Sequence, residues 1–241
     1  MKATVFGDSI LKAVLYEQGR YRMNTALERS FAAEAGITVC NRASFGCTIP
    51  KAMAAIRRDC GTPGGRGDSV LLEFGGNDCD YDWARISRDP GVRIQCKTPP
   101  EEFAALYREA VSLIRLSGRI PVAMTLPPVH SGRYLDFLCR KGLSRENLLL
   151  WLGDAGAIGR RQQTYSELVR QIAREEQAVL ADVRAAFPRE EDALAPLLCE
   201  DGIHPNPAGQ ARILACLREA HRFIEERLRG GLPSPEPALS R

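Results

Sequence analysis

The sequence predicts an α/β fold, a three-layer α/β/α sandwich around a five-stranded parallel sheet. Short apolar runs bounded by Gly, Pro or Asn recur along the chain, and segments with the 3.6-residue spacing of amphipathic helices lie between them. Regular alternation of strand and helix requires parallel strands joined by right-handed crossovers, which favours the doubly wound strand order 2-1-3-4-5. A chain of 241 residues can bury the core of one such domain.

Five runs have the length and composition of buried parallel strands. They span residues 3–6, 37–40, 70–74, 120–126 and 178–183. In an open α/β sheet, ligands bind beyond the carboxyl ends of the strands, where the strand order reverses. In the order 2-1-3-4-5 that point lies beside the first strand, which Gly7, Asp8 and Ser9 follow at once.

Five segments between and after these runs have helical spacing. They span residues 23–35, 50–58, 100–116, 163–177 and 207–228. Pro50 stands at a first-turn position, which suits a residue without a backbone N–H. Glu101 and Glu102 open the third segment, and acidic side chains are favoured at a helix amino end. These signals predict a helical layer on each face of the sheet.

Two stretches, residues 79–98 and 130–161, are longer than ordinary connections. Each follows the carboxyl end of a predicted strand, so we expect them to form a rim or cap over the site. Ser144, three residues before Asn147, is expected to start a short helix there. We expect a single domain over residues 1–228 and a disordered, Pro-rich tail over residues 229–241.

Composition excludes several classes of protein. The 33 basic and 30 acidic residues are mixed along the chain, which gives a net charge of +3 and no basic stripe for nucleic acid. No apolar stretch is long enough to span a membrane, and no export signal is visible, so we expect a cytoplasmic protein. The eight cysteines lack metal-site spacing and are interpreted as buried free thiols, which favours no metal and no cofactor. Cys47 and Cys79 are expected to pack rather than to react.

Ser9 can act as a nucleophile only if a base removes its proton, and the chain has three histidines. His221 lies among charged residues of the last predicted helix, and His130 begins the second insertion. His204 instead follows Asp201 by three residues in the segment CEDGIHPNPAG. That spacing allows the carboxylate to hold one ring nitrogen while the other faces a nucleophile. The alternative is that the segment forms only a turn and a helix start.

An acyl-transfer site also needs hydrogen-bond donors for the developing oxyanion. In the predicted strand order, the loops after the second and third strands flank Ser9. They carry NRASFG and GGND, in which Gly46 offers a backbone N–H at close approach and Asn77 a side-chain amide. Each motif alone is weak, but their coincidence around one serine indicates a catalytic site.

The four blocks FGDS, NRASFG, GGND and DGIHPN occur in this order over residues 6–206. Together they resemble the SGNH hydrolases of the GDSL esterase and lipase superfamily. The resemblance implies a flavodoxin-like fold and a metal-independent serine esterase, with Ser9 as nucleophile, His204 as base and Asp201 orienting it. It also implies an oxyanion hole formed by Ser9, Gly46 and Asn77. Ala43 stands where many members have a further glycine.

The residues after Asn77 and at the start of the second insertion are the candidate substrate rim. Aromatic rings beside carboxylates suit a sugar, and the acidic cluster is expected to disfavour anionic head groups; helix capping and packing explain the same residues equally well. The candidates are Asp80, Tyr81, Trp83, His130, Arg133 and Tyr134.

These features favour an esterase for short acyl groups, with acetyl groups on carbohydrate as candidate substrates. The alternatives are a lipid or aryl esterase, a thioesterase, an acyltransferase on the same fold, or a non-catalytic glycan-binding protein. We expect the protein to bind a small ester rather than nucleic acid or membrane. The sequence is compatible with a monomer and with a homo-oligomer.

Overall fold

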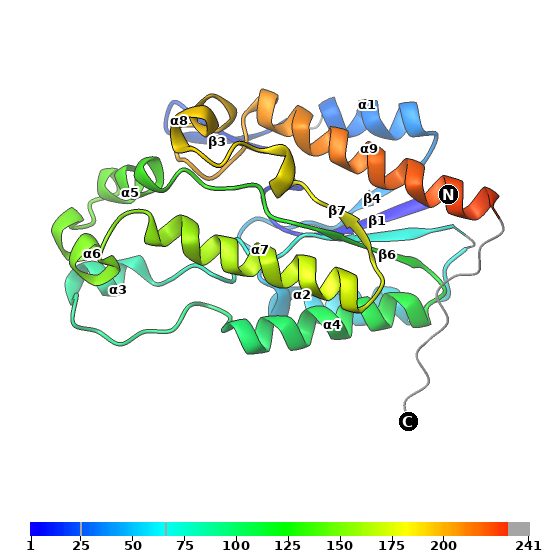
Figure 1. Ribbon diagram of the computed structural model, residues 1–241, viewed down its shortest axis with the longest axis horizontal. Helices are drawn as coiled ribbons and strands as arrows, with labels where there is room; N and C mark the ends of the chain where they lie inside the picture. The colour runs from blue at the N-terminus through cyan, green and yellow to red at the C-terminus, as the bar shows by residue number, and fades with distance from the viewer. Residues whose placement is uncertain (25, 66, 231–241) are drawn as a thin grey trace.

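In the computed structural model, which describes residues 1–24, 26–65 and 67–230, one sheet of five parallel strands forms the centre of the molecule (Figure 1). The strands are β1 (Lys2–Phe6), β4 (Thr38–Asn41), β5 (Ser69–Leu72), β6 (Ile120–Met124) and β7 (Val179–Ala181). They lie in the order β4-β1-β5-β6-β7, and every neighbouring pair is parallel. The predicted order is confirmed, and each predicted strand matches an observed one.

Helices cover both faces of this sheet, as predicted (Figure 1). Helices α1 (Ala26–Ala35) and α9 (Pro207–Arg229) lie on one face. Helices α2 (Ile49–Cys60), α4 (Pro100–Leu116) and α7 (Ala157–Glu175) lie on the other. The sheet has a hydrophobic core on each face, because successive residues of a strand point to opposite sides. In β5, Val70 and Leu72 join one hydrophobic cluster and Leu71 joins the other. Complete burial of such a side chain contributes about 1.5 to 3 kcal/mol.

The helix boundaries differ from the prediction by more than two residues at two places, the starts of α1 and α7. Helix α4 has the predicted bounds, and Pro50 lies in the first turn of α2. Helix α7 begins at Ala157, six residues before the predicted start. The last five residues of the second predicted insertion, 157–161, therefore belong to the start of α7.

An antiparallel hairpin of β2 (Val14–Glu17) and β3 (Arg20–Met23) corrects the predicted helix over residues 23–35. Met23 ends a strand, and α1 begins only at Ala26. Both turn residues have positive φ, 52° at Gln18 and 75° at Gly19, which matches the right-handed twist of a tight hairpin. Because Gln is not among the usual residues at such a turn, the hairpin has only a weak sequence signal.

Three short helices gather at the carboxyl ends of the strands, at the end of the molecule opposite the amino terminus (Figure 1). They are α3 (Trp83–Arg88), α5 (Ser131–Arg140) and α6 (Arg145–Leu152), and we call them the cap. The Ser144 hydroxyl accepts a hydrogen bond from the Asn147 N–H, which confirms the predicted start of α6. The connection from β7 to α9 contains η1 (Arg184–Ala186), α8 (Glu191–Leu194) and η2 (Ala195–Leu197).

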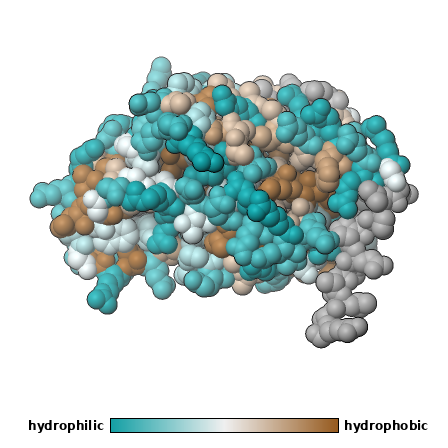
Figure 2. Space-filling model, in the orientation of Figure 1, coloured by the Kyte–Doolittle hydropathy of each residue, from teal (hydrophilic) through white to brown (hydrophobic). Residues whose placement is uncertain are grey.

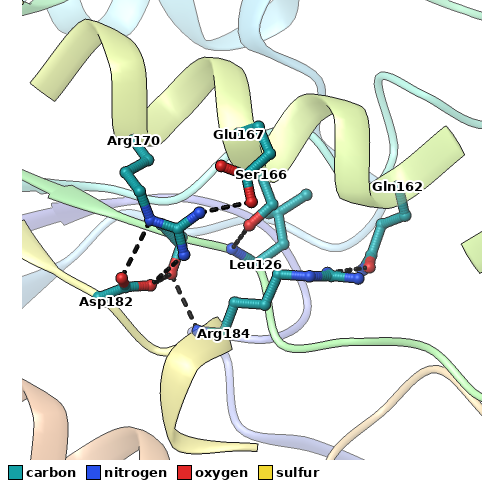
Figure 3. Close-up of polar contacts among 8 residues, drawn as sticks. Leu126, Gln162, Ser166, Glu167, Arg170, Asp182 and Arg184 are labelled. Carbon is teal, nitrogen blue, oxygen red and sulfur yellow. Dashed lines mark hydrogen bonds and ion pairs between the residues drawn. The ribbon is translucent and has the colours of Figure 1, made fainter. Parts of the chain in front are cut away.

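A polar network fixes α7 to the carboxyl ends of β6 and β7 (Figure 3). Arg170 on α7 donates two hydrogen bonds to the Asp182 carboxylate, at 3.0 and 2.8 Å. The Ser166 hydroxyl accepts from the Leu126 N–H at 3.3 Å. Arg184 donates to the Gln162 side-chain oxygen at 2.8 Å. These contacts fix α7 at the edge of the sheet where the site described below lies.

Hydrophobic side chains line a hollow between α7 and α9, over the edge strand β7 (Figure 2). Leu180 and Phe223 are among its residues, and Phe223 is 47% exposed. None of the helices in the described ranges is long and apolar enough to cross a membrane. The predicted tail lies outside the described residues except for Arg229, which ends α9, and Gly230.

Candidate active site

Ser9 lies just beyond the carboxyl end of β1, between the loops that follow β4 and β5. Gly7 allows the chain to pass there, because a Cβ at this position would lie 2.9 Å from the Glu73 carbonyl oxygen. The chain then turns at once, and the Val14 N–H donates to the Ser9 carbonyl at 3.0 Å. Ser9 is buried and lines a cavity.

His204 and Asp201 meet Ser9 from the loop that precedes α9. The His204 Nε2 atom lies 2.8 Å from the Ser9 Oγ, and the His204 Nδ1 atom lies 2.5 Å from the Asp201 Oδ2. The other carboxylate oxygen of Asp201 accepts the backbone N–H groups of Ile203 and His204 at 3.0 and 3.1 Å. A carboxylate accepts only, so Nδ1 carries the proton of the neutral ring and Nε2 can accept the serine proton.

Gly202 shapes the loop that holds this carboxylate. Its φ is 72°, and a Cβ there would lie 2.7 Å from the Arg133 Cβ. The His130 N–H donates to the Gly202 carbonyl at 2.9 Å, and Arg133 donates to the Ala195 carbonyl at 2.7 Å. His130 and Arg133 therefore support the Asp201 loop from α5. They are not among the residues that line the cavity, unlike the other candidate rim residues.

Gly46 and Asn77, the predicted oxyanion donors, line the same cavity as Ser9. Gly46 has a φ of 66°, a conformation that glycine adopts without strain. The Asn77 Nδ2 atom lies 2.6 Å from the Asp8 Oδ2. One amide hydrogen is thereby used, and a second remains on the same nitrogen.

Asp8 and Glu73 form a buried pair of carboxyl groups for which the sequence analysis assigned no role. The Asp8 N–H donates to the Glu73 Oε2 at 3.3 Å, and the Ile10 N–H donates to the Asp8 Oδ1 at 2.8 Å. Burial raises the pKa of both groups, and the Asp8 charge raises that of Glu73 further. The described residues offer the Glu73 Oε1 no hydrogen-bond donor. The protonated form is therefore favoured at Glu73, the member of the pair whose pKa is raised more.

Asp78 fixes the loop that carries Asn77. Its carboxylate accepts the N–H groups of Gly75 and Ile49, both at 3.0 Å, and the Thr98 hydroxyl at 2.7 Å. Burial raises the pKa of Asp78 to about 6, although these three donors favour the charged form. This side chain ties the β5 loop to the start of α2.

Two aromatic side chains flank His204 on its solvent side. The Tyr21 ring meets the imidazole edge to face at 5.6 Å, and the Phe45 ring stacks on it at 6.3 Å. Burial and the nearby Asp201 charge raise the pKa of Tyr21 to about 12. Tyr21 comes from the unpredicted hairpin, and its only sequence signal was the short apolar and aromatic run on either side of Gly19.

A cavity of about 390 Å³ extends from Ser9 beneath the cap, within the size range of small-molecule sites. Asp80, Tyr81, Trp83 and Tyr134 line it. The Asp80 carboxylate accepts from the Trp83 ring at 2.6 Å and the Tyr134 hydroxyl at 3.2 Å, and it forms an ion pair with Lys97 at 2.8 Å. Its charge is therefore matched within the protein. The neighbouring Asp82 is exposed and caps α3 instead.

The two thiols near the oxyanion candidates are not poised for reaction. Burial raises the pKa of Cys47 and of Cys79, so both stay protonated at neutral pH. The Cys79 thiol contacts the Gly76 carbonyl at 3.3 Å. All eight cysteines are free. Over the described ranges, no group of three or more His, Cys, Asp or Glu side chains could hold a metal ion.

A serine, a histidine and an aspartate in hydrogen-bond contact at the carboxyl end of a parallel sheet have the geometry of a serine hydrolase. The model of the GDSL-like lipase/acylhydrolase family matches residues 5–212. The chain therefore belongs to this family of ester hydrolases, also called SGNH hydrolases, and is an esterase-type hydrolase.

Solved structures share the fold at low sequence identity. An α/β hydrolase enzyme from the metagenome of Lake Arreo, Spain, is 20% identical, with a TM-score of 0.62 over 92% of this chain and 95% of that one. A lipase/acylhydrolase from Enterococcus faecalis is 18% identical, with a TM-score of 0.59 over 98% and 99%. An acetylxylan esterase from Geobacillus stearothermophilus is 19% identical, with a TM-score of 0.60 over 91% and 93%. No curated protein matches the chain.

Proposed function

We propose that the protein is a serine esterase that hydrolyses short-chain acyl esters, O-acetyl esters of carbohydrates among them, through an acyl-enzyme. The observation that carries this proposal is the contact of 2.8 Å between the Ser9 Oγ and the His204 Nε2, with Asp201 on the opposite ring nitrogen. A binding protein would not need a nucleophile, a base and an orienting carboxylate in line.

The contacts suggest a two-step reaction. His204 Nε2 takes the Ser9 proton while Oγ forms a bond to the ester carbonyl carbon, and the imidazolium then gives this proton to the departing alcohol. In the second step His204 takes a proton from water, whose oxygen attacks the acyl carbon. Return of the proton to Ser9 releases the acid. The buried Asp201 stabilises the imidazolium in both steps.

The carbonyl oxygen gains negative charge in each step, and the proposed donors are the N–H groups of Ser9 and Gly46 and the free amide hydrogen of Asn77. The Asp8 carboxylate, 2.6 Å from the Asn77 nitrogen, fixes the orientation of this amide before the substrate binds. A preoriented donor stabilises the transition state without reorganisation at the moment of reaction.

The walls of the cavity support a short acyl group. Tyr81 and Trp83, which line the part of the cavity beneath the cap, are buried as walls rather than presented on an open surface. A long acyl chain would have to extend past the cap into solvent.

Two measurements test this function. A fluorophosphonate probe should label the wild-type protein, and the Ser9→Ala and His204→Ala variants should show little or no labelling. Hydrolysis of p-nitrophenyl esters with acyl chains of two to twelve carbons should be fastest for the short ones, and acetylated sugars should release acetate. Labelling that persists in Ser9→Ala would refute the nucleophile, and preference for long chains would refute the substrate class.

A further inference from the structure

We propose that Arg161 forms an anion subsite in the active-site cavity, and that the ester which the enzyme cleaves carries a carboxylate that pairs with this arginine. The inference rests on the proposed function, because it assigns a substrate class to the same cavity. It adds a charge requirement that the sequence pattern did not indicate.

Arg161 lies in the second turn of α7 and lines the cavity together with Ser9 and His204. Its guanidinium lies over the Tyr81 ring, 5.2 Å from the centroid, and donates to the Tyr81 hydroxyl. Gln162, the next residue, is held by the Pro127 carbonyl and by Arg184, which fixes this turn of the helix (Figure 3). The arginine is therefore supported on a fixed wall of the cavity.

No carboxylate among the described residues lies within ion-pair distance of Arg161. Its polar partner among the described residues is the Tyr81 phenol, which stays neutral because burial raises the pKa of Tyr81. The neighbouring Arg160 is the contrast, since it is exposed and pairs with Asp154 at 2.6 Å. A guanidinium stays charged at all ordinary pH values and carries five N–H donors, of which Tyr81 uses one.

The carboxyl groups that line the cavity already have partners within the protein. Lys97 neutralises Asp80, and the Asp8 carboxylate accepts from Asn77 and from the Ile10 N–H. The protonated form of Glu73 is favoured beside Asp8. Among the described residues that line the cavity, Arg161 is the only lysine or arginine, so its positive charge is the one left for a ligand to balance.

The chemistry of the subsite favours a carboxylate. A guanidinium presents paired N–H groups in a plane that matches the two oxygens of a carboxylate, and a charge-assisted bond is stronger beside apolar walls than in water. One arginine balances one negative charge, whereas a phosphate monoester carries about −1.5 to −2 near neutral pH. The carboxylate can belong to the acyl part or to the alcohol part of the ester, and the experiment separates these sources.

The test compares neutral and carboxylate-bearing esters of matched length. The acyl side is probed with p-nitrophenyl valerate and mono-p-nitrophenyl glutarate, and the alcohol side with butyl acetate and 4-acetoxybutyrate. At least one carboxylate ester should have the higher kcat/KM in the wild-type protein. In Arg161→Gln the ratio of carboxylate to neutral ester should fall roughly 10- to 100-fold, the value of one hydrogen-bonded charge. Arg160→Gln, the matched control, should keep the wild-type ratio.

Two results would overturn the subsite. One is a ratio that Arg161→Gln leaves unchanged on both sides of the ester. The other is an equal loss for neutral and carboxylate esters, which would mean that Arg161 only braces Tyr81.

A binding measurement separates this inference from the esterase activity. Calorimetric titration of the Ser9→Ala protein with monomethyl glutarate and with 4-acetoxybutyrate probes both sides of the ester and needs no turnover. Binding that a second substitution, Arg161→Gln, weakens at least tenfold would support the subsite even if no ester were cleaved. Equal binding by the two proteins, or no binding, would refute it. Absence of Ser9-dependent hydrolysis of every ester would instead refute the proposed function.

Discussion

The side-chain nitrogen of Asn77 lies 2.6 Å from the carboxylate of Asp8, the residue directly before Ser9. The candidate oxyanion donor and the candidate nucleophile are thus linked through one side chain, although they follow different strands. The Glu73 carboxyl group accepts a hydrogen bond from the Asp8 N–H, and the Asp78 carboxylate accepts one from the Gly75 N–H in the loop that carries Asn77. Because these buried polar groups contact one another at identified atoms, substitution of a single side chain can test the role of each.

Removal of the Asn77 amide should lower turnover far more than it lowers binding. For Asn77→Ala we expect kcat to fall roughly 100- to 1,000-fold, because one donor to the oxyanion is lost. Steady-state kinetics with p-nitrophenyl acetate would measure it. Asn147→Ala is the control, since that amide binds the Ser87 carbonyl in the cap and does not line the cavity. Near-normal kcat in Asn77→Ala would remove this residue from the oxyanion hole.

Glu73→Gln should change how stability depends on pH. The folded state raises the pKa of Glu73 above its ordinary value of 4.5, so wild-type stability from this group is complete below pH 4.5 and is lost as the pH rises through the raised pKa. Gln cannot ionise. The free energy of unfolding of the variant relative to wild type should therefore rise with pH, by up to about 1.4 kcal/mol per pH unit in that window.

Urea denaturation between pH 4.5 and pH 8 would measure this difference. Glu175→Gln is the control, because hydrogen bonds from Arg108 and Gln171 lower the pKa of this exposed carboxylate below its ordinary value of 4.5. The stability that Glu175 provides is lost only as the pH falls below 4.5, so this variant should run parallel to wild type between pH 4.5 and pH 8. If the Glu73→Gln and wild-type values ran parallel over the whole range, Glu73 would not be the protonated member of the pair.

Tyr21→Ala should expose His204 to water and loosen the imidazole. The ring contact of 5.6 Å is of a kind worth about 0.5 to 1.5 kcal/mol, so we expect kcat/KM to fall roughly 2- to 10-fold. Tyr21→Phe retains the ring and should lose less than Tyr21→Ala. Equal losses would mean that the hydroxyl, not the ring, carries the effect. Kinetics with one short p-nitrophenyl ester would distinguish the two.

Gly202→Ala should damage the Asp201 loop through a clash as well as through backbone strain. Its Cβ would lie 2.7 Å from both the Arg133 Cβ and the His130 carbonyl oxygen, while Gly142 has a similar positive φ and open space around it. Gly142→Ala should cost only the backbone term, about 1 kcal/mol. Gly202→Ala should cost more and should also lower kcat. Thermal unfolding and kinetics of the pair would show it, and equal stability losses would contradict the clash.

Much of the fold could be predicted because strand and helix signals alternate without interruption. The apolar run at β5 and the amphipathic stripe of α4 are local features that a single sequence displays. The β2–β3 hairpin could not be recognised, since its turn uses Gln18 in a conformation more typical of Asn or Gly. The helix prediction then spread over Met23 because the segment has no Pro and only weak strand signals.

The convergence of Ser9, Asp201 and His204 could be expected from motif spacing, but their surroundings could not. Glu73 did leave a signal, as the one charged residue inside an otherwise apolar strand end. The sequence did not indicate that Arg161 would lack an ion-pair partner among the described residues, because ion pairing depends on contacts between distant segments. His130 and Arg133 were placed at the rim by chain position alone, and their hydrogen bonds to the Asp201 loop are tertiary.

The two members of the central contact, Ser9 and His204, are separated by 195 positions. At ordinary rates of translation the ribosome adds the imidazole roughly 10 to 40 s after the hydroxyl. A nascent chain therefore cannot cleave an ester by this route before His204 has been added. During refolding, ester cleavage should begin only when the end of β1 and the loop before α9 have come together. The time at which activity appears therefore measures this step of folding.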